Sequence, residues 1–465
     1  MRRPRQLAER TPAGRERYVD LVRAVAIAAV VLGHWLTITI GYDRRGRLSG
    51  HSALLDLPET RPVTWLLQVL PVFFLVGGYA NAASLAAHRR RGGDGVGWLQ
   101  DRAARLLRPT TALLVVLAAA ALVARLLVGA GPDEVRTVIW LATIPLWFLS
   151  AYLLVVALTP VTYALHRRLG WLVPLALVAL VAAGDVGRLY GPEWLADGSF
   201  LFGWLALHQV GFAWREATAP APDPPRRRWG WLRPARLPPH PRVAVPLLLV
   251  GVPALLLLTL VGPYPVSMVN LPGERIHNMS PPSVALLAVA AGQIGLVLLL
   301  RDPGERWLRR RDPWAVVIAV NGVVLTVFLW HITAVVLLVG ALDALGVLPT
   351  PPVGSAAWWL WRLGWLAALT VPLAGLVAVF GRIELRGWHR PATRPRGLPP
   401  ALARALTRPA PRALLTAAGY AAVVAGLFGN AVAPKTGDHP VGLPVVSLAG
   451  YLAGAALLRL LRSLP

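Results

Sequence analysis

The sequence predicts an all-α fold, a polytopic bundle of transmembrane helices, and three observations support this. Of the 465 residues, 56% are hydrophobic and only 15% are charged. The mean hydropathy is +0.56. Apolar stretches of about 20 residues, the length that crosses a bilayer as a helix, recur along the whole chain. This composition excludes a soluble enzyme that carries a single membrane anchor.

Twelve of these stretches are candidate membrane spans. They comprise residues 18–40, 63–87, 110–130, 138–165, 171–189, 198–214, 243–262, 283–300, 314–340, 357–381, 411–430 and 442–459. A polar linker separates the last two from the first ten. We therefore expect a ten-span core followed by an additional C-terminal pair of helices.

The distribution of charge predicts the orientation of the chain. The net charge is +25, and most of the 47 basic residues fall in alternate loops between the apolar stretches. This pattern fits the positive-inside rule and places both termini in the cytoplasm, with the chain in the plasma membrane. It also argues against nucleic acid as the partner. The chain contains no cysteine, which excludes disulfides and Cys-ligated metals.

The polar segments divide the chain. Residues 1–17 are expected to be a cytoplasmic tail, because this Arg-rich stretch leads straight into a full-length span. Residues 18–382 form the main transmembrane domain, 383–410 a cytoplasmic Pro/Arg-rich linker, and 411–465 the C-terminal pair. Residues 215–242 form a second Pro/Arg-rich linker, whose Arg and Trp content would also suit RNA, although contact with anionic lipid is favoured.

The first span carries the most informative residues, Arg23 and His34. Eleven positions separate them, so on a helix they share one face and lie ~16 Å apart along the axis. Ionisable groups at membrane depth are costly and usually face a bundle interior or an aqueous cavity, which makes them candidates for function. The alternative is that Arg23 reaches the headgroups and that His34 is a hydrogen-bonded core residue.

Further polar residues are secondary candidates. Asp185 lies within the span 171–189, and His208 and His331 can exchange protons near neutral pH. For each of these, an inter-helix hydrogen bond is the alternative interpretation. The external loop 263–282 carries Glu274 among prolines and other polar residues, and it could bind a hydroxylated acceptor or simply be solvated.

Two short motifs complete the set. In WLQDRAARLLRP (98–109), Arg102 and Arg105 are three positions apart on one helix face. A pair of guanidinium groups at a membrane surface suits phosphate, although the positive-inside bias alone also produces arginines there. PVFFLVGGY (71–79) contains a glycine pair that indicates close helix packing.

Taken in order, these motifs resemble the acyltransferase 3 family of integral-membrane acyltransferases over roughly residues 15–382. The matching elements are Arg23-x10-His34, PVFFLVGGY, Arg102-x-x-Arg105 with LLRP, LWFLSAYLL (146–154), and FLWH near the end. The resemblance implies transfer of an acyl group, commonly acetyl from acetyl-CoA, to a hydroxyl of a carbohydrate or other extracytoplasmic acceptor. It associates His34 and Arg23 with activity, and Arg102 and Arg105 with the donor side. The two C-terminal spans depart from the ten-span pattern.

Three functional hypotheses follow. In the favoured one, His34 acts as a general base or as an acyl carrier, Arg23 orients or stabilises charge, Asp185 tunes the site, and no metal takes part. A proton-coupled secondary transporter is the alternative, because intramembrane ionisable residues also form proton relays. The absence of internal similarity between the two halves counts against it. A non-catalytic membrane scaffold is the third.

Overall fold

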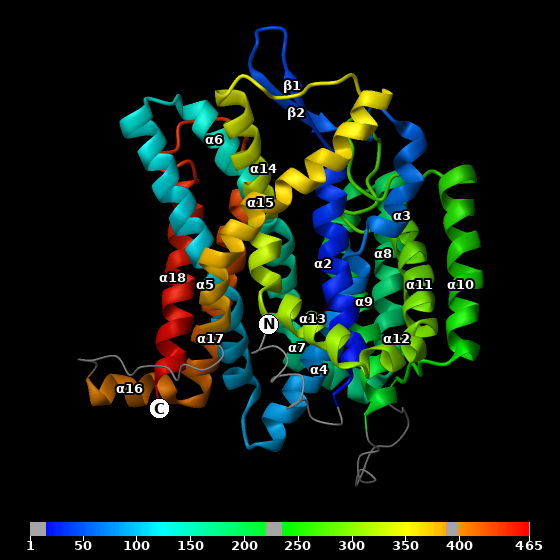
Figure 1. Cartoon of the computed structure of the whole chain (residues 1–465). Helices are drawn as coiled ribbons and strands as arrows, with labels where there is room; N and C mark the ends of the chain where they lie inside the picture. The colour runs from blue at the N-terminus through cyan, green and yellow to red at the C-terminus, as the bar shows by residue number, and fades with distance from the viewer. Residues whose placement is uncertain (1–14, 220–234, 387–398, 465) are drawn as a thin grey trace. The chain divides into compact units, whose positions relative to one another are not determined.

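The computed structural model describes residues 15–219, 235–386 and 399–464 (Figure 1). In chain order the elements are α2 (Arg17–Thr37), β1 (Ile38–Tyr42), β2 (Leu48–Ser52), η1 (Pro58–Val63), α3 (Thr64–Leu67), α4 (Leu70–Arg90), α5 (Gly95–Val123), η2 (Ala124–Val128), α6 (Pro132–Ala142), α7 (Leu146–Leu169), α8 (Leu172–Tyr190), η3 (Glu193–Ala196), α9 (Ser199–Thr218), α10 (Pro241–Leu256), η4 (Leu257–Val261), α11 (Val284–Leu299), α12 (Arg301–Leu308), α13 (Arg311–Gly322), α14 (Val324–Ala344), α15 (Ala356–Arg386), α16 (Pro400–Thr407), α17 (Pro409–Val432) and α18 (Val445–Ser463). The elements belong to two compact units. The first unit holds residues 1–86 and 158–321, and the second holds 87–157 and 322–465.

The predicted class is confirmed, because the described residues include ten helices long and apolar enough to cross a membrane. These spans are α2, η1 to α4, α5 with η2, α7, α8, α10 with η4, α14, α15, α17 and α18. Helices α11 and α12 make an eleventh if they count as one span, bent by 46°. The remaining predicted stretch, residues 198–214, is helix α9. The chain is a multi-pass, all-α membrane protein.

Three predicted spans are each broken into shorter helices. The stretch 63–87 breaks at Gln68, between α3 and α4. The stretch 138–165 is divided between α6 and α7, with Pro145 in the connection between them. A proline disfavours helical geometry at the residue that precedes it, which ends α6. The stretch 314–340 breaks at Val323 between α13 and α14. Glu384 of α15 accepts hydrogen bonds from the main-chain N–H groups of Leu325 (3.2 Å) and Thr326 (2.8 Å). This carboxylate caps the new helix start, because it accepts two of the first main-chain N–H groups of α14.

The first span is shorter than predicted, because α2 ends at Thr37 and the chain continues as a β-hairpin. Strands β1 and β2 are antiparallel, with Thr39 opposite His51. The β-branched residues that follow α2 favour the extended conformation. Asp43 closes the turn by accepting hydrogen bonds from the main-chain N–H groups of Arg45 (2.8 Å) and Arg47 (2.9 Å).

The glycine pair of PVFFLVGGY makes a close helix crossing in the first unit, as predicted. A Cβ atom added to Gly78 in α4 would lie 2.0 Å from the carbonyl oxygen of His208 in α9. A Cβ added to Gly211 in α9 would lie 2.1 Å from the carbonyl oxygen of Leu75. The two backbones therefore touch, which only glycine at both positions permits.

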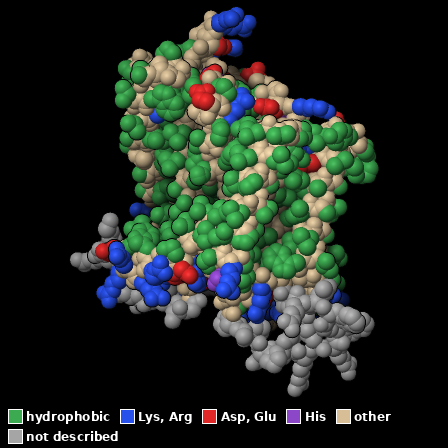
Figure 2. Space-filling model, turned by 90° about the vertical axis from the view of Figure 1, so that its right-hand side faces the viewer, with side chains coloured by type: hydrophobic (Ala, Val, Ile, Leu, Met, Phe, Trp, Pro, Cys, Tyr) green, Lys and Arg blue, Asp and Glu red, His purple; other side chains and the backbone are tan. Residues whose placement is uncertain are grey.

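The outer faces of the first unit are apolar. Helix α10 exposes Leu249 and Val250, each 68% accessible, and Figure 2 shows hydrophobic side chains covering the face on which this helix lies. Exposed apolar surface of this extent is typical of a helix that contacts lipid chains.

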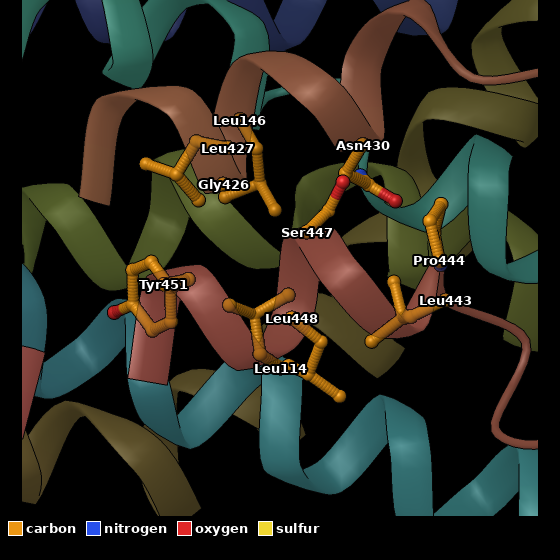
Figure 3. A pocket seen from close by; sticks show the side chains of 10 residues that line it. All are labelled: Leu114, Leu146, Gly426, Leu427, Asn430, Leu443, Pro444, Ser447, Leu448 and Tyr451. Carbon is orange, nitrogen blue, oxygen red and sulfur yellow. The ribbon is translucent and has the colours of Figure 1, made fainter. Parts of the chain in front are cut away.

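In the second unit, α17 and α18 pack against each other through glycines and lie along α5 (Figure 1). A Cβ on Gly454 would lie 2.7 Å from the carbonyl oxygen of Gly419, and one on Gly426 would lie 2.5 Å from that of Ser447. A small, mostly apolar pocket lies among these helices (Figure 3). None of the candidate site residues lines it.

The crossing at Gly78 gives the first testable prediction. We expect Gly78→Ala to lower the melting temperature of the detergent-purified protein by several degrees, because overpacking costs about 1–3 kcal/mol. The matched control is Gly340→Ala in α14, where an added Cβ meets nothing within 4 Å. Thermal unfolding followed by size-exclusion chromatography measures both variants. A Gly78→Ala protein that melts with the wild type would contradict the close crossing.

Candidate active site

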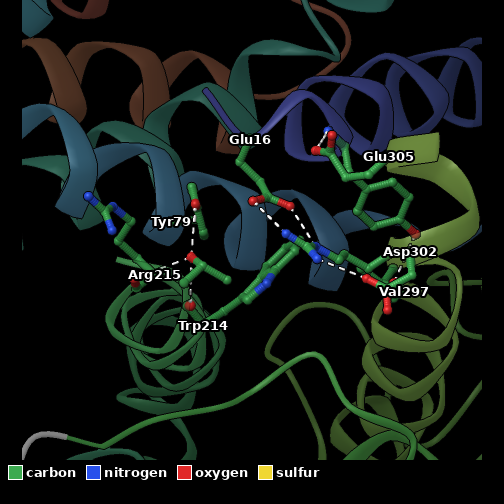
Figure 4. Close-up of polar contacts among 10 residues, drawn as sticks. Glu16, Tyr79, Trp214, Arg215, Val297, Asp302 and Glu305 are labelled. Atoms are coloured by element: carbon green, nitrogen blue, oxygen red, sulfur yellow. Dashed lines mark hydrogen bonds and ion pairs between the residues drawn. The ribbon is translucent and has the colours of Figure 1, made fainter. Parts of the chain in front are cut away.

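The start of α2 is held by polar contacts with α11 and α12 (Figure 4). The Arg301 guanidinium donates to both carboxylate oxygens of Glu16, at 2.8 and 3.0 Å. Glu305 accepts the main-chain N–H of Tyr18 at 2.7 Å, and the Tyr18 hydroxyl donates to the carbonyl of Val297 at 2.8 Å. These contacts fix both the depth and the rotation of α2, and therefore the positions of Arg23 and His34.

Arg23 is paired with an acid on its own helix. Its Nη1 lies 3.2 Å from Oδ1 of Asp20, a residue that is only 7% exposed. Arg15 binds the other oxygen of the same carboxylate at 2.8 Å. Asp20, unlike Arg23, was not among the residues predicted from the sequence. The signal that could have found Asp20 is its spacing of three residues from Arg23 within one span, since such pairs face each other on a helix.

His34 lies in the last turn of α2 and is half-buried. Its imidazole is hydrogen-bonded to the main-chain carbonyl of Val30, one turn earlier. One ring nitrogen therefore carries a proton, and in the neutral form the other holds a lone pair that can accept one. Because α2 is an unbroken helix, Arg23 and His34 share a face, ~16 Å apart along the axis.

The second span is interrupted beside the turn of α2 that contains His34. A Cβ on Gly33 would lie 3.9 Å from that of Leu67, the last residue of α3. The carbonyls left unpaired by the break at Gln68 are satisfied from α11, because Gln293 Nε2 donates to Trp65 O (2.8 Å) and to Gln68 O (3.0 Å). Oε1 of Gln293 is buried and has no hydrogen-bond partner among the described residues. Irregular backbone of this kind occurs in membrane proteins where it is enclosed by protein or lines an aqueous cavity.

The loop 263–282 rests on η1 and α3. Trp65 Nε1 donates to the carbonyl of Val266 at 2.7 Å, and the main-chain N–H of Met268 donates to the Thr64 hydroxyl at 2.9 Å. Glu274 forms an ion pair with Arg61 of η1 at 3.4 Å. The predicted part of Glu274 in binding an acceptor remains a prediction.

Asp185 holds this loop at both ends. Its carboxylate is paired with Arg188 and accepts the Tyr264 hydroxyl (2.8 Å) and the main-chain N–H of Val284 (2.7 Å) at the start of α11. Arg188 in turn donates to the carbonyl of His277 at 2.8 Å. Burial raises the pKa of Tyr264, and the Asp185 charge raises it further, so the phenol stays a donor. These contacts position the loop, and the catalytic assignment of Asp185 remains a prediction.

The two other candidate histidines are fully buried, at 0% exposure. His208 Nε2 lies 3.1 Å from the amide nitrogen of Asn81 in α4. His331 Nδ1 donates to the carbonyl of Phe328 in its own helix at 2.6 Å. The catalytic parts of these two histidines remain predictions, whereas His34 differs from them in its partial exposure.

A further buried histidine, His166 in α7, was not among the candidates. Its Nδ1 donates to the amide oxygen of Gln209 at 3.1 Å. One turn earlier, the hydroxyl of Tyr163 donates to the carboxylate of Glu216 at 2.6 Å. The only sequence signal for this group is polar residues repeating at helical spacing on α7 and α9.

Arg102 and Arg105 lie near the start of α5, in the second unit. Arg102 is half-buried and its guanidinium is 6.0 Å from the ring centre of Trp98, while Arg105 is exposed. The charged groups that act on Arg105 include the cations Arg91, Arg102 and Arg462 and the acid Asp101. This segment therefore carries a local excess of positive charge.

Comparison with known proteins identifies the family. A family model described as an acyltransferase domain matches residues 16–381, from α2 through most of α15. No curated protein and no solved structure matches significantly. The matched residues include Arg23, His34, Arg102 and Arg105, and exclude α17 and α18. The chain therefore belongs to the acyltransferase 3 family and is a membrane O-acyltransferase.

Proposed function

We propose that the protein transfers an acetyl group from acetyl-CoA, bound on the cytoplasmic side of the plasma membrane, to a hydroxyl of a carbohydrate or other extracytoplasmic acceptor. The observation that carries this proposal is the geometry of α2. One unbroken helix presents the Arg23–Asp20 pair near its start and a half-buried imidazole, His34, near its end. The concentration of arginines in alternate loops supports an orientation with both termini in the cytoplasm.

The donor-binding part of the proposal rests on Arg102 and Arg105. Coenzyme A carries a pyrophosphate and a 3′-phosphate, and guanidinium groups bind phosphate oxygens with paired hydrogen bonds. The two side chains lie three residues apart on α5, next to other cations. The pantetheine arm is long, so a thioester can reach into the protein while the phosphates stay at the surface.

Chemistry at His34 follows from its unprotonated ring nitrogen. In the general-base route, the acceptor hydroxyl attacks the thioester carbonyl carbon while His34 takes the hydroxyl proton. The C–S bond then breaks, and the departing CoA thiolate takes the proton from the imidazolium. In the acyl-carrier route, the imidazole nitrogen attacks the thioester carbonyl carbon, the C–S bond breaks, and the CoA thiolate takes the proton from the other ring nitrogen. The acceptor hydroxyl then attacks the acyl carbon, the C–N bond to His34 breaks, and the hydroxyl proton returns to the imidazole. Both routes need an accessible imidazole.

Arg23 acts on a different part of the donor from His34. The two residues lie ~16 Å apart along the helix. The thioester of the donor therefore cannot contact both of them at once. We place Arg23 toward the charged portion of the donor and His34 at the thioester. The loop 263–282 with Glu274 then lies beside the segment that borders His34, where an acceptor would bind.

The function is tested with His34→Ala. We expect the purified variant to lose transfer of labelled acetyl from acetyl-CoA to cell-envelope acceptor by 10²- to 10⁴-fold, the usual contribution of a general base. His439→Ala is the matched control, because His439 is also half-buried but lies outside the family match. Wild-type rates in His34→Ala would overturn the assignment. Proton-coupled uptake without any need for CoA would favour the transporter alternative.

The Asp20–Arg23 pair gives a second prediction. We expect Asp20→Asn to lower the free energy of unfolding by about 1–3 kcal/mol, because the two guanidinium groups lose the negative charge and one of the two acceptor oxygens of this buried side chain. The double variant Asp20→Asn/Arg23→Gln should recover part of this stability but should remain inactive. Thermal unfolding and acetyl transfer measure the two effects. Full activity in the double variant would show that Arg23 is only structural.

A further inference from the structure

The C-terminal pair α17–α18 lies outside the family match but contacts the donor-side segment directly. The contacts reach the residues that immediately precede Arg102. They are Arg412 to Asp94 (3.0 Å) and to Gln100 (3.2 Å), Gln100 to Thr416 (3.0 Å), the Tyr420 hydroxyl to the carbonyl of Leu99 (2.8 Å), and Arg462 to Asp101 (2.9 Å). Two ion pairs and three hydrogen bonds thus join the pair to the first two turns of α5.

The hydrogen-bonded part of this network is inaccessible to water, whereas the side chains of Asp94 and Asp101 in the two ion pairs are exposed. Gln100 is 3% exposed, Thr416 is 1% exposed and Tyr420 is 2% exposed. Buried polar groups that are fully paired rigidify the elements they join, because breaking one contact leaves the other groups unpaired. The start of α5 is therefore fixed in place by the C-terminal pair.

The opposite end of the pair is also fixed within the second unit. Arg136 of α6 is fully buried and donates to the carbonyls of Pro434 (2.9 Å) and Gly442 (3.2 Å) in the connection between α17 and α18. Along the length of the pair, the Tyr451 hydroxyl lies 2.9 Å from the Thr111 hydroxyl of α5. Contacts at both ends and in the middle make the pair an integral support of α5 rather than a loosely attached anchor.

Arg462 also brings charge to the donor-side segment. It comes from the last turn of α18, pairs with Asp101, and is among the cations that act on Arg105. Arg102 and Arg105 alone supply two positive charges next to Asp101, which offsets one of them. Arg462 raises the surplus of these four side chains from one positive charge to two, which suits a ligand with several phosphate charges.

We propose that Arg462 is a further donor-binding residue, a cation supplied by the C-terminal pair to the phosphates of coenzyme A. This inference rests on the proposed function and deepens it. The pair α17–α18 holds the start of α5 and completes its phosphate site, which explains why a chain with a full family domain carries two more spans.

The test measures binding of coenzyme A itself to the full-length purified protein by calorimetry. We expect Arg462→Gln to raise the Kd about tenfold, the change that ~1.4 kcal/mol of binding free energy produces, and to reduce the salt dependence of binding. Arg459→Gln is the matched control, because Arg459 lies one turn earlier on α18, is exposed, and forms no hydrogen bond or ion pair with the described residues.

A second variant separates binding from support. Asp101→Asn breaks the same ion pair but removes a negative charge. If Arg462 binds the phosphates, the Asp101→Asn variant should bind coenzyme A as tightly as the wild type or more tightly. Equal weakening by Arg462→Gln and Asp101→Asn would show a purely structural contact and overturn the inference, as would unchanged binding in Arg462→Gln. If the wild type binds no coenzyme A, the proposed function fails and this inference fails with it.

Discussion

A charge placed within a membrane-spanning helix must be paired or hydrated, and helix α2 is arranged around this constraint. At the start of this helix the charged side chains that the structure describes have partners. Glu16 pairs with Arg301, and Asp20 pairs with both Arg15 and Arg23. These pairs fix the helix against α11, α12 and its own flanking residues. His34 is consequently held at a defined level, beside the interrupted second span.

Binding of the donor and removal of the acceptor proton are assigned to different helices. The proposed phosphate site is built on α5 and is supported by α17 and α18, whereas the imidazole belongs to α2. Each part is rigid for its own reason. Buried polar pairs hold the start of α5, and a close glycine crossing with a polar anchor at α12 holds the helices around α2. Both parts follow a general requirement of catalysis, which is that reacting groups be held in place before the substrate arrives.

The sequence predicted the spans because apolar stretches of membrane length are local features, and it predicted Gly78 as a packing position for the same reason. It did not predict the breaks at Gln68 and Val323, because the groups that stabilise them, Gln293 and Glu384, lie far along the chain. The hairpin after α2 was missed because its β-branched residues extend an apolar run. The contacts of Asp185 with Tyr264 and Val284 likewise depend on tertiary structure. Such partners have no sequence signal of their own.

We propose that an acyl group passes from a donor on one side of the membrane to an acceptor on the other with His34 of α2 at the point of transfer, and a measurement of sidedness tests this most directly. Purified protein would be reconstituted in sealed liposomes with acetyl-labelled acetyl-CoA inside and cell-envelope oligosaccharide outside. The account expects label on the external oligosaccharide while CoA remains enclosed, and loss of this signal when His34 is replaced by alanine. Labelling only when donor and acceptor share one compartment would contradict the account.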